Sequence, residues 1–201
     1  MEINKEYMQE LDKYIKGIVD VRKENGERVS WDYYFIMKAT IAATRATCLR
    51  RGFGAVIVDL IDHSIVGSGY CGNAAGTTNC IDLKKCFREE AKIPSGMLYD
   101  LCQSIHAEEN AITDAGKKQC KGKTIYISGI DFSTGKLFYG KPCYKCESRI
   151  INAGLEKIVY MDNNYDIITV DVKGQAKWRK KNPFEASEKE LNLLKEKGFK
   201  I

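Results

Sequence analysis

Two short motifs in the second half of the sequence carry residues that can bind a metal ion. His106 begins a His-x-Glu motif, and Cys143 and Cys146 belong to a Pro-Cys-x-x-Cys motif. Two cysteines three positions apart lie on one face of a helical turn, so both can reach one ion. With His106 from a second helix as third ligand, a tetrahedral zinc site keeps its fourth position open for water. The spacing therefore predicts zinc bound by His106, Cys143 and Cys146.

Glu108 lies two residues after this histidine and is not needed as a ligand. From there its carboxylate can take a proton from metal-bound water and pass it to a leaving group. Zinc lowers the pKa of bound water toward about 7, which enables attack on an electron-poor C=N carbon that bears an amino group. Each motif alone is weak, since Cys-x-x-Cys also occurs in redox and structural zinc sites. Together they match a signature of zinc deaminases and favour hydrolytic deamination over a purely structural metal site.

The hydrophobic pattern around the motifs predicts alternating helices and strands. Helices are expected over residues 3–24, after Ser30 as N-cap, over 105–116, over 142–153, and between Ser187 and Gly198. Strands are expected over 53–59 and 64–70, which form a hairpin, and over 123–128 and 157–161. Residues 71–102 show no clear pattern. This order predicts an α/β sandwich with helices on both faces of a mixed sheet, in which 1–30 form a helical extension and 31–201 the deaminase domain.

Composition indicates a globular protein of the cytoplasm. The chain has 201 residues, 44% hydrophobic and 29% charged, and its net charge of +5 permits an anionic substrate without requiring nucleic acid. No apolar run reaches the roughly 18 residues of a membrane span, and the acidic start is unlike a signal peptide. In a reducing compartment, eight cysteines point to metal binding or catalysis rather than to disulfides.

Several segments resemble the deoxycytidylate (dCMP) deaminase family. They are residues 31–35, 47–51 (Thr-Cys-Leu-Arg-Arg), 54–58, 93–96 (Ile-Pro-Ser-Gly), 105–112, 142–146 and 152–154 (Asn-Ala-Gly). The resemblance covers roughly residues 31–161. It implies a three-layer α/β/α sandwich of the cytidine-deaminase type that converts dCMP to dUMP and ammonia. It also implies a homo-oligomer, because family members usually assemble.

Four further cysteines lie near these motifs: Cys48, Cys80, Cys86 and Cys102. They resemble positions at which family members can bind a second metal, and we predict a structural zinc with four thiolate ligands. A closed tetrahedral sulfur site would anchor the irregular segment of residues 71–102. The alternative is a set of ordinary buried cysteines, which are common in protein cores.

Two departures from the family pattern concern the substrate pocket. The family has Gly-Tyr-Asn-Gly after the second strand, with the Asn contacting substrate, whereas this sequence has Cys71 there and Asn73 two residues later. A thiol replaces an amide poorly, so Asn73 is a candidate for that contact, and Tyr165 resembles a family tyrosine near the nucleotide. The alternatives are a backbone role for Asn73 in a turn and ordinary packing for Tyr165. Residues 129–141 form an insertion that predicts an extra hairpin beside the zinc site.

Three other interpretations stay open. The main one is a deaminase of another small aminated heterocycle, such as a nucleoside, a purine nucleotide or an antibiotic. A nucleic-acid-editing deaminase would need a basic or aromatic groove, and only residues 177–181 (Lys-Trp-Arg-Lys-Lys) suggest one. A solvated surface run explains them more simply. A non-enzymatic zinc-binding module would keep the metal ligands but would not need Glu108.

Overall fold

The computed structural model describes residues 2–94 and 97–198. Ser95 and Gly96, part of one motif that carries the resemblance, therefore lie outside the described residues. The chain divides into two compact units, Met1–Tyr34 and Phe35–Ile201. The boundary lies inside helix α2 (Trp31–Ala43), four residues beyond the end at residue 30 that the sequence predicts for the N-terminal extension.

The first unit is dominated by the helix α1 (Glu2–Asn25), which confirms the helix predicted over residues 3–24. Gly26 follows with a φ of 70°, a conformation that commonly ends helices. The backbone N–H of Tyr33 donates to Ser30 Oγ at 3.4 Å, which is the predicted N-cap contact at the start of α2. No described helix combines the length and the apolar character that a membrane crossing requires.

The second unit is built on a mixed sheet with the strand order β2-β1-β5-β7-β8, to which β6 adds by pairing with β5. Only the β5–β7 pair is parallel among these neighbours. The strands are β1 (Arg51–Val58), β2 (Ile65–Tyr70), β5 (Thr124–Asp131), β6 (Lys136–Phe138), β7 (Lys157–Met161) and β8 (Ile167–Asp171). A separate pair joins β3 (Gly72–Asn73) and β4 (Ser104–Ile105). The predicted hairpin of the first two strands is confirmed.

Helix α2, from Phe35 onward, covers one face of this sheet. Gly54 of β1 permits the close approach, because a Cβ there would lie 2.0 Å from the carbonyl oxygen of Ala39. Thr40 and Ser128 hydroxyls lie 2.8 Å apart across the interface. The side chains of β1 and β5 that face α2 are therefore small or polar where the helix backbone comes nearest.

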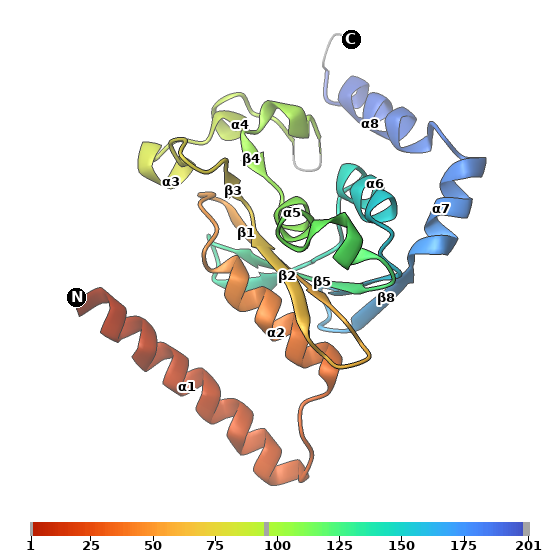
Figure 1. Ribbon diagram of the computed structural model, residues 1–201. Coiled ribbons are helices and arrows are strands. Elements are labelled where there is room, and N and C mark those ends of the chain that lie inside the picture. Colours follow the sequence, from red (N-terminus) through yellow and green to blue (C-terminus); the bar gives the residue numbers. More distant parts are fainter. Residues whose placement is uncertain (1, 95–96, 199–201) are drawn as a thin grey trace. The chain divides into compact units, whose positions relative to one another are not determined.

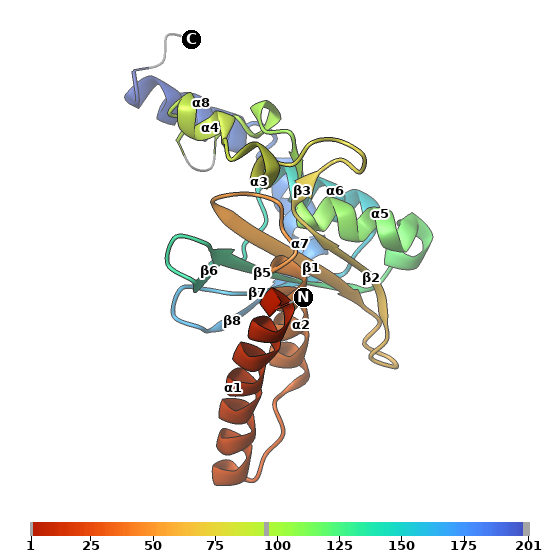
Figure 2. The ribbon, with the colours of Figure 1, turned by 90° about the vertical axis from the view of Figure 1, so that its left-hand side faces the viewer.

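Helices α5 (Ala107–Cys120) and α6 (Tyr144–Ala153) cover the opposite face, as Figures 1 and 2 show. Gly69 of β2 lets α5 pack closely, since a Cβ there would lie 2.4 Å from the backbone nitrogen of Ala111. Ile57, Ile127 and Ile150 belong to the buried cluster between the sheet and these helices. Helices on both faces of a mixed sheet confirm the predicted three-layer sandwich.

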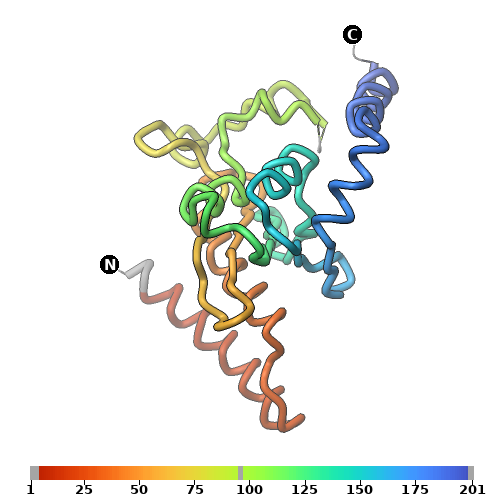
Figure 3. Tube along the Cα trace, turned by 45° about the vertical axis from the view of Figure 1, so that its right-hand side comes forward, coloured from red at the N-terminus to blue at the C-terminus, as the bar shows by residue number. Residues whose placement is uncertain are grey.

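The C-terminal part of the chain differs from the sequence-based prediction. Strand β8 and helix α7 (Val172–Lys181) were not predicted. Helix α7 has no apolar stripe that would mark it in the sequence. It begins after Asp171, whose carboxylate accepts a hydrogen bond from the N–H of Gly174 at 2.6 Å. Figure 3 shows α7 in blue beside α6 in cyan. Helix α8 (Glu185–Glu196) confirms a closing helix here but begins two residues before Ser187, where its start was predicted, with Phe184 as N-cap. Acidic residues in its first turn suit the positive end of the helix dipole.

Between β3 and β4, the described residues form three short helices: α3 (Cys80–Leu83), α4 (Phe87–Glu90) and the 3-10 turn η1 (Tyr99–Leu101). The organising side chain of this segment is Arg88, which is 7% exposed. The Arg88 guanidinium donates to the carbonyl oxygens of Pro94, Met97 and Leu98. A charged side chain buried among backbone carbonyls thus replaces the regular structure that this segment lacks.

Candidate active site

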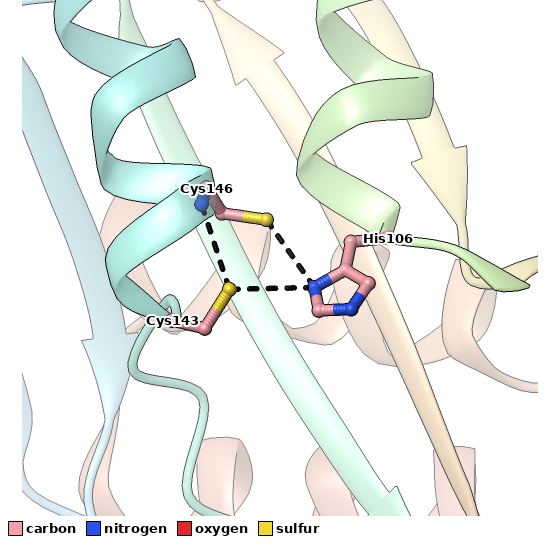
Figure 4. A group of neighbouring side chains, drawn as sticks. All are labelled: His106, Cys143 and Cys146. Carbon is pink, nitrogen blue, oxygen red and sulfur yellow. Dashed lines mark hydrogen bonds between the residues drawn. The ribbon is translucent and has the colours of Figure 1, made fainter. Parts of the chain in front are cut away.

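The starts of α5 and α6 bring together the three predicted zinc ligands. His106 is the N-cap residue of α5, Cys143 is the N-cap residue of α6, and Cys146 lies in the first turn of α6. Their side chains point toward one another (Figure 4). The His106 Nδ1 atom lies 3.6 Å from the sulfur of Cys143 and 3.3 Å from that of Cys146, and all three donor atoms lie within 4.8 Å of one another.

These separations suit a zinc ion. Zinc–sulfur bonds of about 2.3 Å and zinc–nitrogen bonds of about 2.0–2.1 Å in a tetrahedral site place nitrogen and sulfur ligands roughly 3.6 Å apart. The two observed nitrogen–sulfur distances lie at or slightly below that value. One nitrogen and two sulfurs also form a donor set that zinc prefers. The residues present therefore fit the metal that the sequence predicts.

Contacts around His106 fix both its backbone and its ring. Its backbone N–H donates to the Glu109 carboxylate at 3.2 Å, and Glu109 forms an ion pair with Arg149 of α6 at 2.7 Å. The ring of Tyr99 stands edge-on to the His106 ring, with 5.0 Å between the ring centroids. The two helices that carry the ligands are thereby tied together next to the site.

The local electrostatics favour a thiolate at Cys143. A hydrogen bond from the Cys146 thiol outweighs burial and, together with the His106 ring, lowers the pKa of the Cys143 thiol well below its ordinary value. The same bond, assisted by burial, raises the pKa of Cys146. Burial alone would lower the pKa of His106, but its hydrogen bond with Cys143 and the charge of Glu108 raise it. Since the thiolate is the form that binds metals, Cys143 is ready to act as a ligand, whereas Cys146 and His106 would each release a proton when a cation binds.

Glu108 lies in the same site and is almost fully buried, with 5% of its surface exposed. Burial raises the pKa of its carboxyl group, although the nearby His106 opposes that shift. Glu108 thus stands beside the three potential ligands without being one of the group that meets around a common point.

A cavity of 390 Å³ opens at this site, and His106, Glu108 and Cys143 contribute to its wall. The rest of the wall is rich in aromatic and cationic side chains, namely Phe53, Tyr99, Phe138, Tyr139, Arg50, Arg51, Arg88 and Lys141. A volume of this size suits a small organic ligand. The cations make the cavity suitable for an anionic one.

The insertion at residues 129–141 supplies part of this wall. Its strand β6 pairs antiparallel with β5, so the predicted extra hairpin is confirmed. The hairpin brings Phe138, Tyr139 and Lys141 to the cavity. The Arg51 guanidinium lies 4.0 Å from the centre of the Phe138 ring and 3.9 Å from the Asp131 carboxylate, so the hairpin also orients a cation of β1.

The four other predicted metal ligands, Cys48, Cys80, Cys86 and Cys102, all line this cavity. Burial raises the pKa of Cys80, and the proximity of the other three thiols raises it further. Among the described residues, however, His106, Cys143 and Cys146 are the one group of three potential ligands whose donor atoms lie within 4.8 Å of one another. The four thiols are neighbours but are not gathered around one point.

The predicted substrate contacts have different surroundings. Cys71 lines the cavity, yet its sulfur accepts from the N–H of Phe53 at 3.2 Å and its thiol lies 3.6 Å from the Arg51 carbonyl oxygen. The amide nitrogen of Asn73 donates to the Thr78 carbonyl oxygen. Tyr165 lies in the β7–β8 turn with a φ of 68°. In the described part of the chain, the cavity wall includes neither Asn73 nor Tyr165.

Sequence reasoning missed several residues of the site. Tyr99, beside the His106 ring, and Arg88, whose guanidinium carbon lies 5.3 Å from the Tyr99 ring centre, both belong to the segment without a hydrophobic pattern. No spacing in the sequence marks either residue. Arg51 was noted only as part of a family-like motif, and its meeting with Phe138 depends on the β5–β6 hairpin.

Comparison with known proteins places the chain in a family of zinc-binding deaminases. The model of the "Cytidine and deoxycytidylate deaminase zinc-binding region" matches residues 29–162. The chain therefore belongs to the cytidine and deoxycytidylate deaminase family, as the sequence motifs predicted, and zinc is the cofactor that this family assignment implies.

Individual relatives carry more specific names. The deoxycytidylate deaminase of Mycobacterium phage D29 is 33% identical over 137 residues, which cover 66% of this chain and 95% of that protein. The deoxycytidylate deaminase of Schizosaccharomyces pombe is 32% identical over 141 residues, covering 70% of this chain and only 40% of the yeast protein. The crystal structure of dCMP deaminase from the cyanophage S-TIM5 aligns with this chain at 22% identity and a TM-score of 0.45. The aligned region covers 65% of this chain and 82% of the cyanophage chain.

Proposed function

We propose that this chain catalyses the zinc-dependent hydrolytic deamination of dCMP to dUMP and ammonia. The observation that carries the proposal is the meeting of His106, Cys143 and Cys146 beside a cavity whose wall includes the buried Glu108. The relatives named deoxycytidylate deaminase support this choice of substrate. A non-enzymatic zinc module would have no use for a buried carboxyl group beside the metal ligands.

In this mechanism His106, Cys143 and Cys146 would hold the zinc ion, which supplies a Lewis acid that makes water a nucleophile near neutral pH. The Glu108 carboxylate would carry both protons of that water, one to the ring nitrogen of the attacked C=N bond and one to the amino nitrogen, which leaves as ammonia while the oxygen stays on the carbon. The burial of Glu108 limits proton exchange with bulk solvent.

The phosphate of the nucleotide would bind among the cationic side chains of the cavity. Arg51 is held between the Phe138 ring and Asp131, while Arg50 is paired with Glu89 at 3.2 Å. Lys141 enters the same wall from the inserted hairpin. The aromatic rings of the wall offer flat surfaces for the cytosine base. Contacts of Asn73 and Tyr165 with the substrate stay predictions, whereas the Cys71 thiol is engaged by the backbone of β1.

A panel of substrates tests this proposal directly. Ammonia release is measured with dCMP, CMP, deoxycytidine, purine nucleotides and a single-stranded DNA oligonucleotide. We expect the highest kcat/KM for dCMP and a lower value for deoxycytidine, because deoxycytidine lacks the phosphate that the cations would bind. The Glu108→Gln protein, purified in parallel, reports any contaminating deaminase. Turnover of a purine nucleotide or of the oligonucleotide, with dCMP, CMP and deoxycytidine untouched, would refute the proposal.

We also propose a second zinc ion, bound by Cys48, Cys80, Cys86 and Cys102. Their common position at one cavity and the mutual influence of their thiols support this site. Because these thiols do not meet around one point, binding would require the segment of residues 80–86 to adjust. A tetrathiolate zinc would then stabilise a segment that has little regular structure.

The proposal also covers the oligomeric state of the chain and its place in the cell. We propose that the chain forms a homo-oligomer, as the resemblance implies, and that it acts in the cytoplasm on a free nucleotide rather than on nucleic acid. Light scattering during gel filtration measures the assembly, and a monomeric mass at working concentration would contradict it. Cell fractionation measures the location.

A further inference from the structure

One cation of the basic run at residues 177–181 lies inside the protein instead of in solvent. The side chain of Arg179 on α7 is only 11% exposed, and that of Glu147 on α6, its ion-pair partner, is 15% exposed. In contrast, Lys177, Lys180 and Lys181 are exposed, as expected for a solvated surface run. The structure therefore separates Arg179 from the run to which its sequence position assigns it.

Within the described residues, the hydrogen bonds of the Arg179 guanidinium go to the beginning of α6. The guanidinium donates to the Glu147 carboxylate at 2.6 Å, to the Ser148 hydroxyl at 2.5 Å and to the Tyr144 carbonyl oxygen at 2.9 Å. It also lies 3.7 Å from the centre of the Tyr144 ring. A planar guanidinium can satisfy several acceptors and stack on a ring at the same time, which a lysine ammonium cannot do.

The residues that Arg179 contacts alternate with the thiol ligands along the chain. Tyr144 directly follows Cys143, and Glu147 directly follows Cys146. We propose that Arg179 is a positioning residue of the zinc site, which holds the first turn of α6 where both thiols face His106. The inference rests on the proposed ligand set and adds a residue from a helix that carries no ligand.

The first turn of a helix needs such support. Its N–H groups lack partners within the helix, and helix ends fray when nothing else fixes them. Within α6, a weak contact of the Cys146 N–H with the Cys143 sulfur at 3.5 Å spans this turn. The Glu109–Arg149 ion pair ties α6 to α5 further along the helix. Arg179 is thus the side chain that fixes the ligand-bearing turn from the opposite helix, α7.

The experiment compares Arg179→Met with Lys180→Met, which removes an exposed cation from the same turn of α7. Zinc affinity is measured by competition with a chromophoric chelator, and the ligand geometry by the visible absorption of the cobalt(II)-substituted protein. We expect Arg179→Met to weaken zinc binding about 10–100-fold, as is typical for residues that support metal ligands, and to change the cobalt spectrum. Lys180→Met should leave both unchanged. If folded Arg179→Met has the same zinc affinity and the same cobalt spectrum as the unsubstituted chain, the inference is overturned.

Two milder variants decide the matter if Arg179→Met does not fold. Arg179→Lys keeps the charge but loses the planar contacts, and Glu147→Gln keeps an acceptor but loses the charge. Both should bind zinc more weakly than the original chain and with an altered cobalt spectrum, whereas wild-type behaviour of both would refute the positioning role. Failure of the original chain itself to bind zinc would instead reject the proposed ligand set, so the two failures are distinguishable.

Discussion

Two groups of proposed metal ligands lie at one cavity, and they are built in different ways. His106, Cys143 and Cys146 stand at the starts of two helices that pack on the sheet. Cys48, Cys80, Cys86 and Cys102 stand on loops and at the edges of short helices. The donor atoms of the first group already lie within 4.8 Å of one another, whereas those of the second do not meet.

The difference shows that the positions of the donor atoms depend on how firmly the surrounding segments are held. The first group inherits its geometry from a buried core that includes Ala107, Ala111 and Ile150 of the two helices. The second group depends on a segment held mainly by Arg88 and backbone turns. We therefore expect metal binding to complete the structure of the second group but to leave the first almost unchanged.

The largest effect is expected at Glu108, which serves only the first group. Glu108→Gln should lower kcat for dCMP about 10²–10⁴-fold, because an amide cannot carry the proton. Zinc content should stay the same, since Glu108 is not a ligand. The control is Glu156→Gln, which alters an exposed carboxylate before β7. Near-normal kcat in Glu108→Gln would sink the mechanism, and loss of zinc would show that Glu108 is a ligand after all.

The next prediction separates the two metal groups. Elemental analysis should find two zinc ions per chain and one fewer in either Cys143→Ser or Cys86→Ser. Cys143→Ser should lose activity with little change in thermal stability, because the core holds its helix in place. Cys86→Ser should lower the unfolding temperature, since its segment has few other supports. A single zinc in the original chain would reject the second site, and equal effects of both variants on stability would remove the contrast between the groups.

The same contrast explains what the sequence could predict. The helix starts at His106 and Cys143 were predictable because capping positions, ligand spacing and apolar periodicity agree there. The hairpin of residues 129–141 was also predictable from its turn residues. These features are determined by residues close together in the chain, so their pattern can be recognised in a single sequence.

Contacts between distant segments could not be predicted in this way. Nothing in the spacing of Arg179 or Tyr99 shows that one would contact α6 and the other the His106 ring. Strand β8 is as long as β7, which was predicted, and only its antiparallel pairing with β7 identifies it. Asn73 was chosen for its chemistry and proximity in sequence, and its amide instead contacts the Thr78 carbonyl oxygen.

The smallest effect is expected at Cys71, a cavity cysteine that belongs to neither group. Burial raises the pKa of its thiol to about 12, so it stays protonated at neutral pH and is a poor metal ligand. Its sulfur accepts from the Phe53 N–H, and its thiol faces the Arg51 carbonyl oxygen, which makes it part of the strand packing. Cys71→Ala should therefore lower the free energy of unfolding by about 1–2 kcal/mol, because it removes a buried hydrogen bond and leaves a small void.

The kinetic part of this prediction addresses the substrate pocket. Because the Cys71 thiol is occupied by the backbone of β1, Cys71→Ala should leave KM for dCMP unchanged. Urea unfolding followed by fluorescence measures the stability, and initial rates of ammonia release measure KM. Cys71→Ser is the matched variant, since a hydroxyl keeps a donor and an acceptor and should recover part of the lost stability. A raised KM without loss of stability would mean that the thiol contacts the substrate, and that the cysteine has taken over the role of the family asparagine.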